Sequence, residues 1–165
     1  MDPKQEALAE IDATRTFFDR STSALAEEDS TFRATPETMT VAAMVAHVAQ
    51  TIDWLRAGAL DDDWRLDFEA QFEETNRVES LAAARRRLDE AWGRLRARIE
   101  GMSAAELGAP MADNPILQTR PRSYGIGAVV DHTGHHRGSL AVFARLLGKV
   151  PPNPYMAEEA AQLPM

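Results

Sequence analysis

Cysteine is absent from the 165 residues of this chain, and its absence restricts the chemistry that the protein can carry out. Without cysteine there is no disulfide framework, no thiolate metal site and no thiol nucleophile of the protein's own. Any metal ion must therefore be held by nitrogen and oxygen atoms. No apolar run approaches the roughly 18 residues of a transmembrane helix. The charged N-terminus also lacks the apolar core of a signal peptide.

Basic residues are also scarce. The chain contains 18 Lys and Arg against 26 Asp and Glu, which gives a formal net charge of -8 at pH 7. Binding to a nucleic-acid backbone needs a basic surface, so we expect no nucleic-acid partner and, with no spanning segment, no membrane partner. The composition is typical of a soluble cytoplasmic protein.

Apolar residues recur at helical spacing in four long stretches, and no stretch reads convincingly as a strand. We predict helices over residues 3–28, 40–60, 80–100 and 125–148, with Thr40 and Ser80 as N-caps and Gly148 as the C′ residue at which the last helix ends. Residues 62–78 read as an irregular crossover with room for a short helix, and residues 102–124 as a long loop. The predicted fold is all-α: a single four-helix bundle with long crossover connections over residues 1–150, followed by a C-terminal extension over residues 151–165.

The four histidines fall in two places. His47 lies in the second predicted helix, and His132, His135 and His136 lie together in the fourth, in DHTGHHRGSL. Residues four apart on a helix share a face, because successive residues rotate by about 100°. With a third imidazole from another helix, such a pair would bind one face of a divalent metal and leave positions open. The alternative is that the imidazoles are surface residues or isolated hydrogen-bonding groups in the core.

The helix faces distinguish among the histidines. His136 lies within the apolar stripe of the fourth helix, His132 lies at its border, and His135 lies on the polar flank. We therefore favour the pair His132 and His136 over the rival pair His132 and His135. His47 lies at the border of the apolar stripe of its own helix, so three imidazoles are predicted to face the interior.

Several neighbouring residues allow two interpretations. Asp131 and Asp53 are either helix-surface charges or carboxylates that orient a metal ligand. Arg137 either supports the fold or binds a substrate carboxylate. Trp54 is either a core residue or part of a pocket near the histidines.

The segments VAAMVAHVAQTIDWL and DHTGHHRGSLAVFARLLG resemble the DinB / YfiT-like superfamily. The second is similar to the family's H-x-x-H-H-R-G-Q-L stretch, with Ser139 in place of the usual Gln, which puts any contact made by that Gln in doubt. The resemblance covers the whole chain in helix order and implies a four-helix bundle, a homodimer and a divalent metal held by His47, His132 and His136. Some members are similar to transferases or isomerases that use a low-molecular-weight thiol.

Three functions are consistent with these residues. The first is a metal-dependent enzyme that acts on a small-molecule substrate, as a transferase with an external low-molecular-weight thiol or as a hydrolase, with zinc or nickel as the metal. The second is a non-catalytic metal-binding stress-response bundle, which a fourth protein ligand such as Asp53 or Asp131 would favour. The third is a ligand-binding or dimerising module without metal. For the enzyme, we expect the 102–124 loop to cover the site, and metal to be released below about pH 6.

Overall fold

The computed structural model describes residues 2–156, and within them it is all-helical, as predicted. Its elements, in chain order, are α1 (Pro3–Thr22), the 3-10 turn η1 (Glu27–Asp29), α2 (Val41–Leu55), the π-helical turn η2 (Arg56–Leu60), α3 (Phe68–Asn76), α4 (Leu81–Glu100), α5 (Ala104–Gly108) and α6 (Tyr124–Leu146). No helix in this part of the chain is both long enough and apolar enough to cross a membrane.

Local signals position the helix ends. The side chains of Thr40 and Ser80 each accept a hydrogen bond from the backbone N–H three residues later, at 3.1 Å in both cases, which confirms the two predicted N-caps. Gly148 adopts a φ of 75° just beyond α6, a conformation that glycine tolerates far better than other residues. The predicted start and end of α4 are confirmed as well.

The first helix is shorter than predicted. Its periodic pattern suggested continuation to residue 28, but α1 ends at Thr22. The Ser23 hydroxyl donates to the Arg20 carbonyl at 2.9 Å, and the Asp29 carboxylate accepts from the Ala26 N–H at 2.7 Å. These local side-chain bonds offer the backbone an alternative to the helical ladder, so the chain leaves the helix early.

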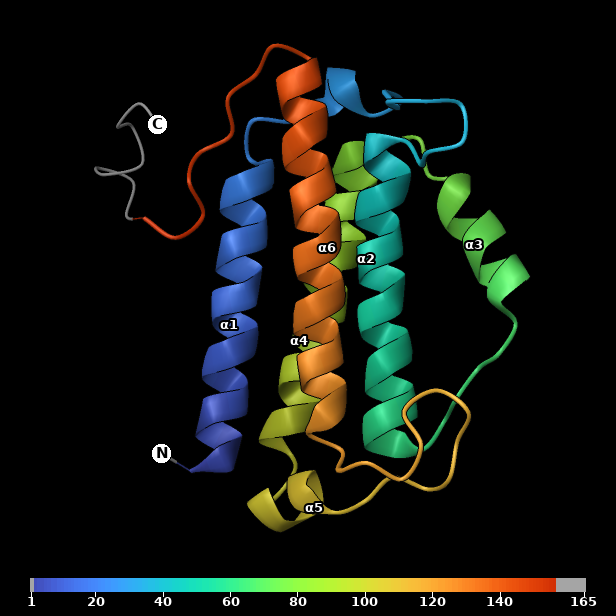
Figure 1. Ribbon diagram of the computed structural model, residues 1–165, viewed down its shortest axis with the longest axis vertical. Helices are drawn as coiled ribbons and strands as arrows, with labels where there is room; N and C mark the ends of the chain where they lie inside the picture. The colour runs from blue at the N-terminus through green and yellow to red at the C-terminus, as the bar shows by residue number, and fades with distance from the viewer. Residues whose placement is uncertain (1, 157–165) are drawn as a thin grey trace.

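The four long helices run side by side along the long axis of the molecule (Figure 1). Helix α2 packs against α4 and α6, and α1 packs against the same two helices. Helix α3 lies outside this arrangement next to α2, and α5 with the loop that follows it lies at one end (Figure 1). One continuous core joins the elements, and its largest fully buried side chains include Phe18, Ile52, Leu95, Ile99 and Leu140.

A close approach of backbones joins α6 to η2. A Cβ atom built on Gly125 would lie 2.2 Å from the Cβ of Ala59, so only glycine fits at this point without movement. The contact sets the start of α6 against the end of the second long helix, and so helps to fix the relative position of the two helices that carry the histidines.

The predicted C-terminal extension is described as far as residue 156, and residues 157–165 lie outside the described part. The segment turns back along α1, where the Tyr155 ring packs edge-to-face on Phe17 with centroids 5.1 Å apart. Arg20 donates to the carbonyl oxygens of Pro154 and Met156.

Candidate metal centre

Helix α2 presents one narrow stripe that is not fully buried. Eleven of its 15 residues are buried, and the remaining four are His47, Gln50, Asp53 and Trp54. Their spacing of three or four residues aligns them along one face of the helix. His47 is thus positioned by the burial of its neighbours, and it faces the adjacent stripe of α6.

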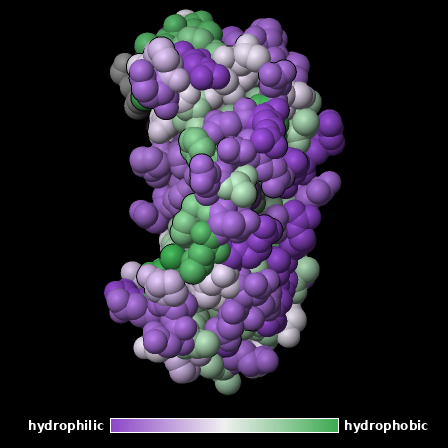
Figure 2. Space-filling model, turned by 90° about the vertical axis from the view of Figure 1, so that its right-hand side faces the viewer, coloured by the Kyte–Doolittle hydropathy of each residue, from purple (hydrophilic) through white to green (hydrophobic). Residues whose placement is uncertain are grey.

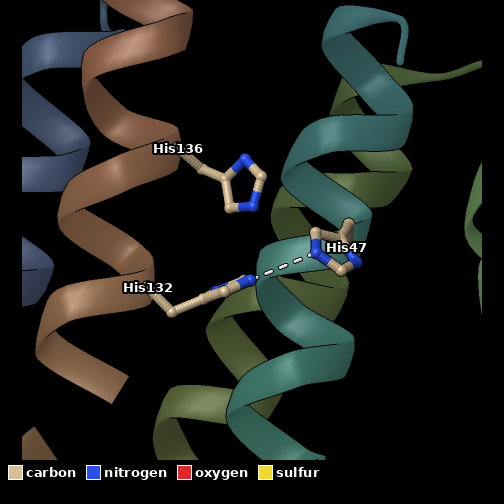
Figure 3. A group of neighbouring side chains, drawn as sticks. All are labelled: His47, His132 and His136. Carbon is tan, nitrogen blue, oxygen red and sulfur yellow. Dashed lines mark hydrogen bonds between the residues drawn. The ribbon is translucent and has the colours of Figure 1, made fainter. Parts of the chain in front are cut away.

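His132 and His136 meet His47 from α6, one helical turn apart, and the three rings point toward one another (Figure 3). The ring centroid of His47 lies 5.0 Å from that of His132 and 4.9 Å from that of His136, and the centroids of the two α6 rings are 4.5 Å apart. One ring nitrogen from each histidine lies within 4.8 Å of the others. Below, this group is called the histidine triad.

The spacing of the nitrogen atoms suits a shared ligand. The Nε2 atoms of His47 and His132 are 3.1 Å apart, close enough for one to donate a hydrogen bond to the other. Two nitrogens bound to the same tetrahedral ion at about 2.0–2.1 Å would be separated by roughly 3.3 Å. The pair therefore has nearly the separation that a common metal ion requires.

Burial keeps the triad neutral. Desolvation, followed by the repulsion of the other imidazoles, lowers the pKa of His132 to about 4 and of His136 to about 3. Asp131 acts in the opposite direction on His132, but its effect is smaller. Burial also lowers the pKa of His47. Neutral imidazole is the form that binds a metal, so these shifts lower the pH at which protons compete with a metal, below the value of about 6 expected from free histidine.

Two polar atoms of the triad lack partners. The Nδ1 atoms of His132 and His136 are buried and make no hydrogen bond to any residue in the described range 2–156. An unpartnered buried polar group costs about 1–3 kcal/mol. Three neutral imidazoles, each with one ring nitrogen within 4.8 Å of the others, form a donor set that fits a divalent cation.

The neighbouring residues have other partners. His135 is exposed and packs edge-to-face against His136, with ring centroids 4.8 Å apart, in agreement with its predicted rim position. Asp53 accepts two hydrogen bonds from Arg94, at 2.8 and 2.6 Å. Arg137 donates to the Tyr155 hydroxyl at 2.8 Å, a contact that favours the structural interpretation of this residue. Among residues 2–156, only three of the candidate ligand residues come together here, without a fourth.

Asp131 and Ser139 lie beside the triad without joining it. Asp131 is exposed, as expected for a helix-surface charge. The Ser139 hydroxyl donates to the carbonyl of His135 at 3.3 Å, one turn earlier in its own helix. At the position where the family usually has Gln, this chain therefore has a side chain that is bonded to the backbone.

A pocket of about 510 Å³ adjoins the triad. His47 and His132 line it together with Trp54, and with Phe68 and Phe72 from α3. Of the two interpretations of Trp54, the pocket residue is therefore confirmed. The prediction that the 102–124 loop covers the site was wrong, since none of the lining residues belongs to it. Phe68 and Phe72 were not among the predicted site residues. Their spacing of four residues indicates a shared helix face, but the charged residues around them obscured this pattern.

Comparisons with known proteins agree with this architecture. The DinB superfamily profile matches residues 6–140. The chain therefore belongs to the DinB superfamily. A crystal structure of a Streptococcus pneumoniae protein shares the fold, with a TM-score of 0.68 and 15% sequence identity over 87% of this chain and 91% of that one. No curated protein matches the chain.

Proposed function

We propose that the protein binds one divalent metal ion, zinc or nickel, through His47, His132 and His136. We further propose that it is a metal-dependent enzyme for a small-molecule substrate, a thiol-dependent transferase or a hydrolase. The observation that carries this proposal is the convergence of three neutral imidazoles from α2 and α6, with nitrogen atoms within 4.8 Å of one another. Membership of the DinB superfamily supports it.

The number of ligands favours catalysis over a structural role. Structural zinc sites normally have four protein ligands, whereas catalytic sites have three and keep a position open. The carboxylate nearest in the stripe of α2, Asp53, is engaged by Arg94. When bound, the ion would supply Lewis acidity that lowers the pKa of a coordinated water or thiol.

The chain's own residues have three tasks in this proposal. The triad stays unprotonated at neutral pH because of its burial, so it is ready to bind a cation without losing protons. The core side chains of α2 and α6 hold the imidazole-bearing backbones in fixed positions. The adjacent aromatic side chains border the triad on one side and line the pocket that a substrate would enter. With no cysteine of its own, the protein would need an external thiol for thiol transfer.

Metal analysis and ligand exchange would test the proposal. Purified protein, without an affinity tag that binds metal, should contain about one divalent ion per chain. Cobalt(II) should give a visible spectrum that shifts when imidazole or a low-molecular-weight thiol is added, because an open position accepts a new ligand. A bound metal whose spectrum never shifts would instead indicate the non-catalytic metal-binding bundle. Protein that binds no metal would refute the proposal.

We also propose that α1, α2, α4 and α6 form a four-helix bundle of the DinB type, and that two chains associate as a homodimer. The side-by-side packing of these helices supports the first statement. Light scattering coupled to gel filtration would test the second, and a mass equal to the 18.2 kDa chain would contradict it.

A further inference from the structure

The pocket beside the triad has a distinct chemical character. Its wall includes the rings of Trp54, Phe68 and Phe72. Among the described residues that line it, Glu69 is the only acidic or basic one apart from the two histidines. A volume of about 510 Å³ is within the range of small-molecule sites. Below it is called the aromatic pocket. It lies between α2, α3 and the His132 turn of α6.

The aromatic wall is fixed on one side. The Trp54 indole N–H donates to the Arg65 carbonyl at 2.6 Å, and the Trp54 ring packs edge-to-face with Trp64 at 4.9 Å and with Phe68 at 5.6 Å. These contacts hold the indole in one orientation in the pocket wall that it shares with His47, although Trp54 belongs to the stripe of α2 that is not fully buried.

The other side of the pocket is unusually exposed. Phe68 and Phe72 are 52% and 51% exposed and lie one turn apart on α3. The face of the molecule that includes α3 is mostly hydrophilic, with a few hydrophobic patches among the hydrophilic residues (Figure 2). Large apolar side chains that stay exposed together often mark a binding site. Here Phe68 and Phe72 line the same pocket as two of the proposed metal ligands, His47 and His132. A small molecule bound there would contact the aromatic rings and the metal site together.

A hydrogen bond between helices keeps the two phenylalanines in place. The Gln50 amide of α2 donates to the Gln71 side-chain oxygen of α3. Gln71 in turn donates to the Asp67 carboxylate at 2.9 Å, at the start of α3. Because α3 contributes few buried side chains of its own, this connection helps to decide where Phe68 and Phe72 lie relative to the triad.

We propose that the aromatic pocket binds the uncharged, apolar part of the substrate, an aromatic ring or a compact alkyl group, while a donor atom of the same molecule reaches the metal on the triad. Phe68 and Phe72 are then specificity-determining residues. The inference rests on the proposed open metal site. An anionic group in the aromatic part of the pocket is disfavoured, because it would meet apolar rings and Glu69 while the donor atom of the same molecule already occupies the metal.

Three small ligands would test the inference on cobalt(II)-loaded protein: imidazole, phenylimidazole and carboxyphenylimidazole. Each can bind the metal through nitrogen, so the comparison isolates the added group. Burying a phenyl ring should make phenylimidazole bind about 10- to 100-fold more tightly than imidazole. The carboxylate should remove most of this gain. Spectral titration gives the three dissociation constants.

Variants identify the residues responsible. Phe72→Ala and Phe68→Ala should each reduce the preference for phenylimidazole over imidazole by about 3- to 10-fold and leave imidazole affinity unchanged. Leu66→Ala is the matched control, because Leu66 is 52% exposed just before α3 but does not line the pocket. Circular dichroism would verify that each variant remains helical.

The outcomes separate this inference from the proposed function. Absence of cobalt or of any imidazole shift refutes the open metal site. The pocket can then still be tested on the apo protein, where saturation-transfer NMR should show phenylimidazole but not imidazole bound, with the signal weakened by Phe72→Ala. Equal affinities for imidazole and phenylimidazole on the cobalt form, or equal effects of Leu66→Ala and Phe72→Ala, would overturn the aromatic pocket as a substrate site.

Discussion

Removal of His136 should abolish tight metal binding, whereas removal of His135 should not. The two residues are adjacent in sequence, but His136 belongs to the triad and His135 is exposed outside it. Zinc sites with four protein ligands bind with about 10–16 kcal/mol, or roughly 3 kcal/mol per ligand. Loss of one ligand therefore corresponds to a loss of affinity of about 100-fold or more. His135 contributes only an edge-to-face contact with His136 and a weak repulsion, so we expect His135→Ala to change affinity by less than about 3-fold.

Competition with a chromophoric chelator at neutral pH would measure both variants against the original protein. His136→Gln serves as a second variant that keeps side-chain volume and polarity, so that a loss of affinity is not mistaken for a packing defect. Thermal unfolding of the apo forms would show that each variant folds. Equal losses for His135→Ala and His136→Ala would refute the assignment of the two faces of α6, and full retention in both His136 variants would refute the triad as the metal site.

Four further predictions concern the pH response of the triad, Asp53 and the close approach at Gly125. Metal should be retained on dialysis at about pH 5, where free imidazole is largely protonated. The reason is that the pKa values of His132 and His136 are lowered to about 4 and about 3. Complete release of the metal at about pH 6 would contradict this prediction. The same shifts mean that the folded apo protein binds fewer protons than the unfolded chain, so its free energy of unfolding should fall as pH drops from about 6.5 toward 3, as measured by urea titration. Asp53→Asn should leave metal affinity unchanged, since the Asp53 carboxylate is bound by Arg94. The same change should lower the free energy of unfolding by at most about 1 kcal/mol. A large loss of bound metal would identify Asp53 as a ligand. Gly125→Ala should destabilise the fold by about 1–3 kcal/mol, because the new Cβ atom would clash with Ala59. Gly127→Ala is the control: its Cβ atom would meet open space, so the change should be neutral or slightly stabilising. Equal melting temperatures for the two variants would show that the close approach is not required.

Local patterns in the sequence were sufficient for the long helices and for the faces of α6. Helical periodicity depends only on neighbours within a few residues, so the apolar stripes, the N-caps at Thr40 and Ser80 and the partial burial of His132 and His136 could be predicted. The pattern failed at residues 23–28, where side-chain bonds to the backbone end the helix. It was also weak in α3, where polar residues surround the aromatic pair and the helix contributes only one buried residue, Thr75.

Contacts between distant segments were decided by the tertiary structure. His47 lies 85 residues from His132, and no local rule determines which turn of α2 faces which turn of α6. That register follows from the packing of the core and from the close approach of Gly125 to Ala59. The same packing decides three further features: the pairing of Asp53 with Arg94, the aromatic pocket beside α3, and the position of the 102–124 loop away from that pocket. The sequence by itself thus determined the residues capable of binding a metal and the helix faces that carry them. Only the three-dimensional packing determined that they meet, and what surrounds them, because residues far apart in the chain are brought together by the burial of side chains that all the helices share.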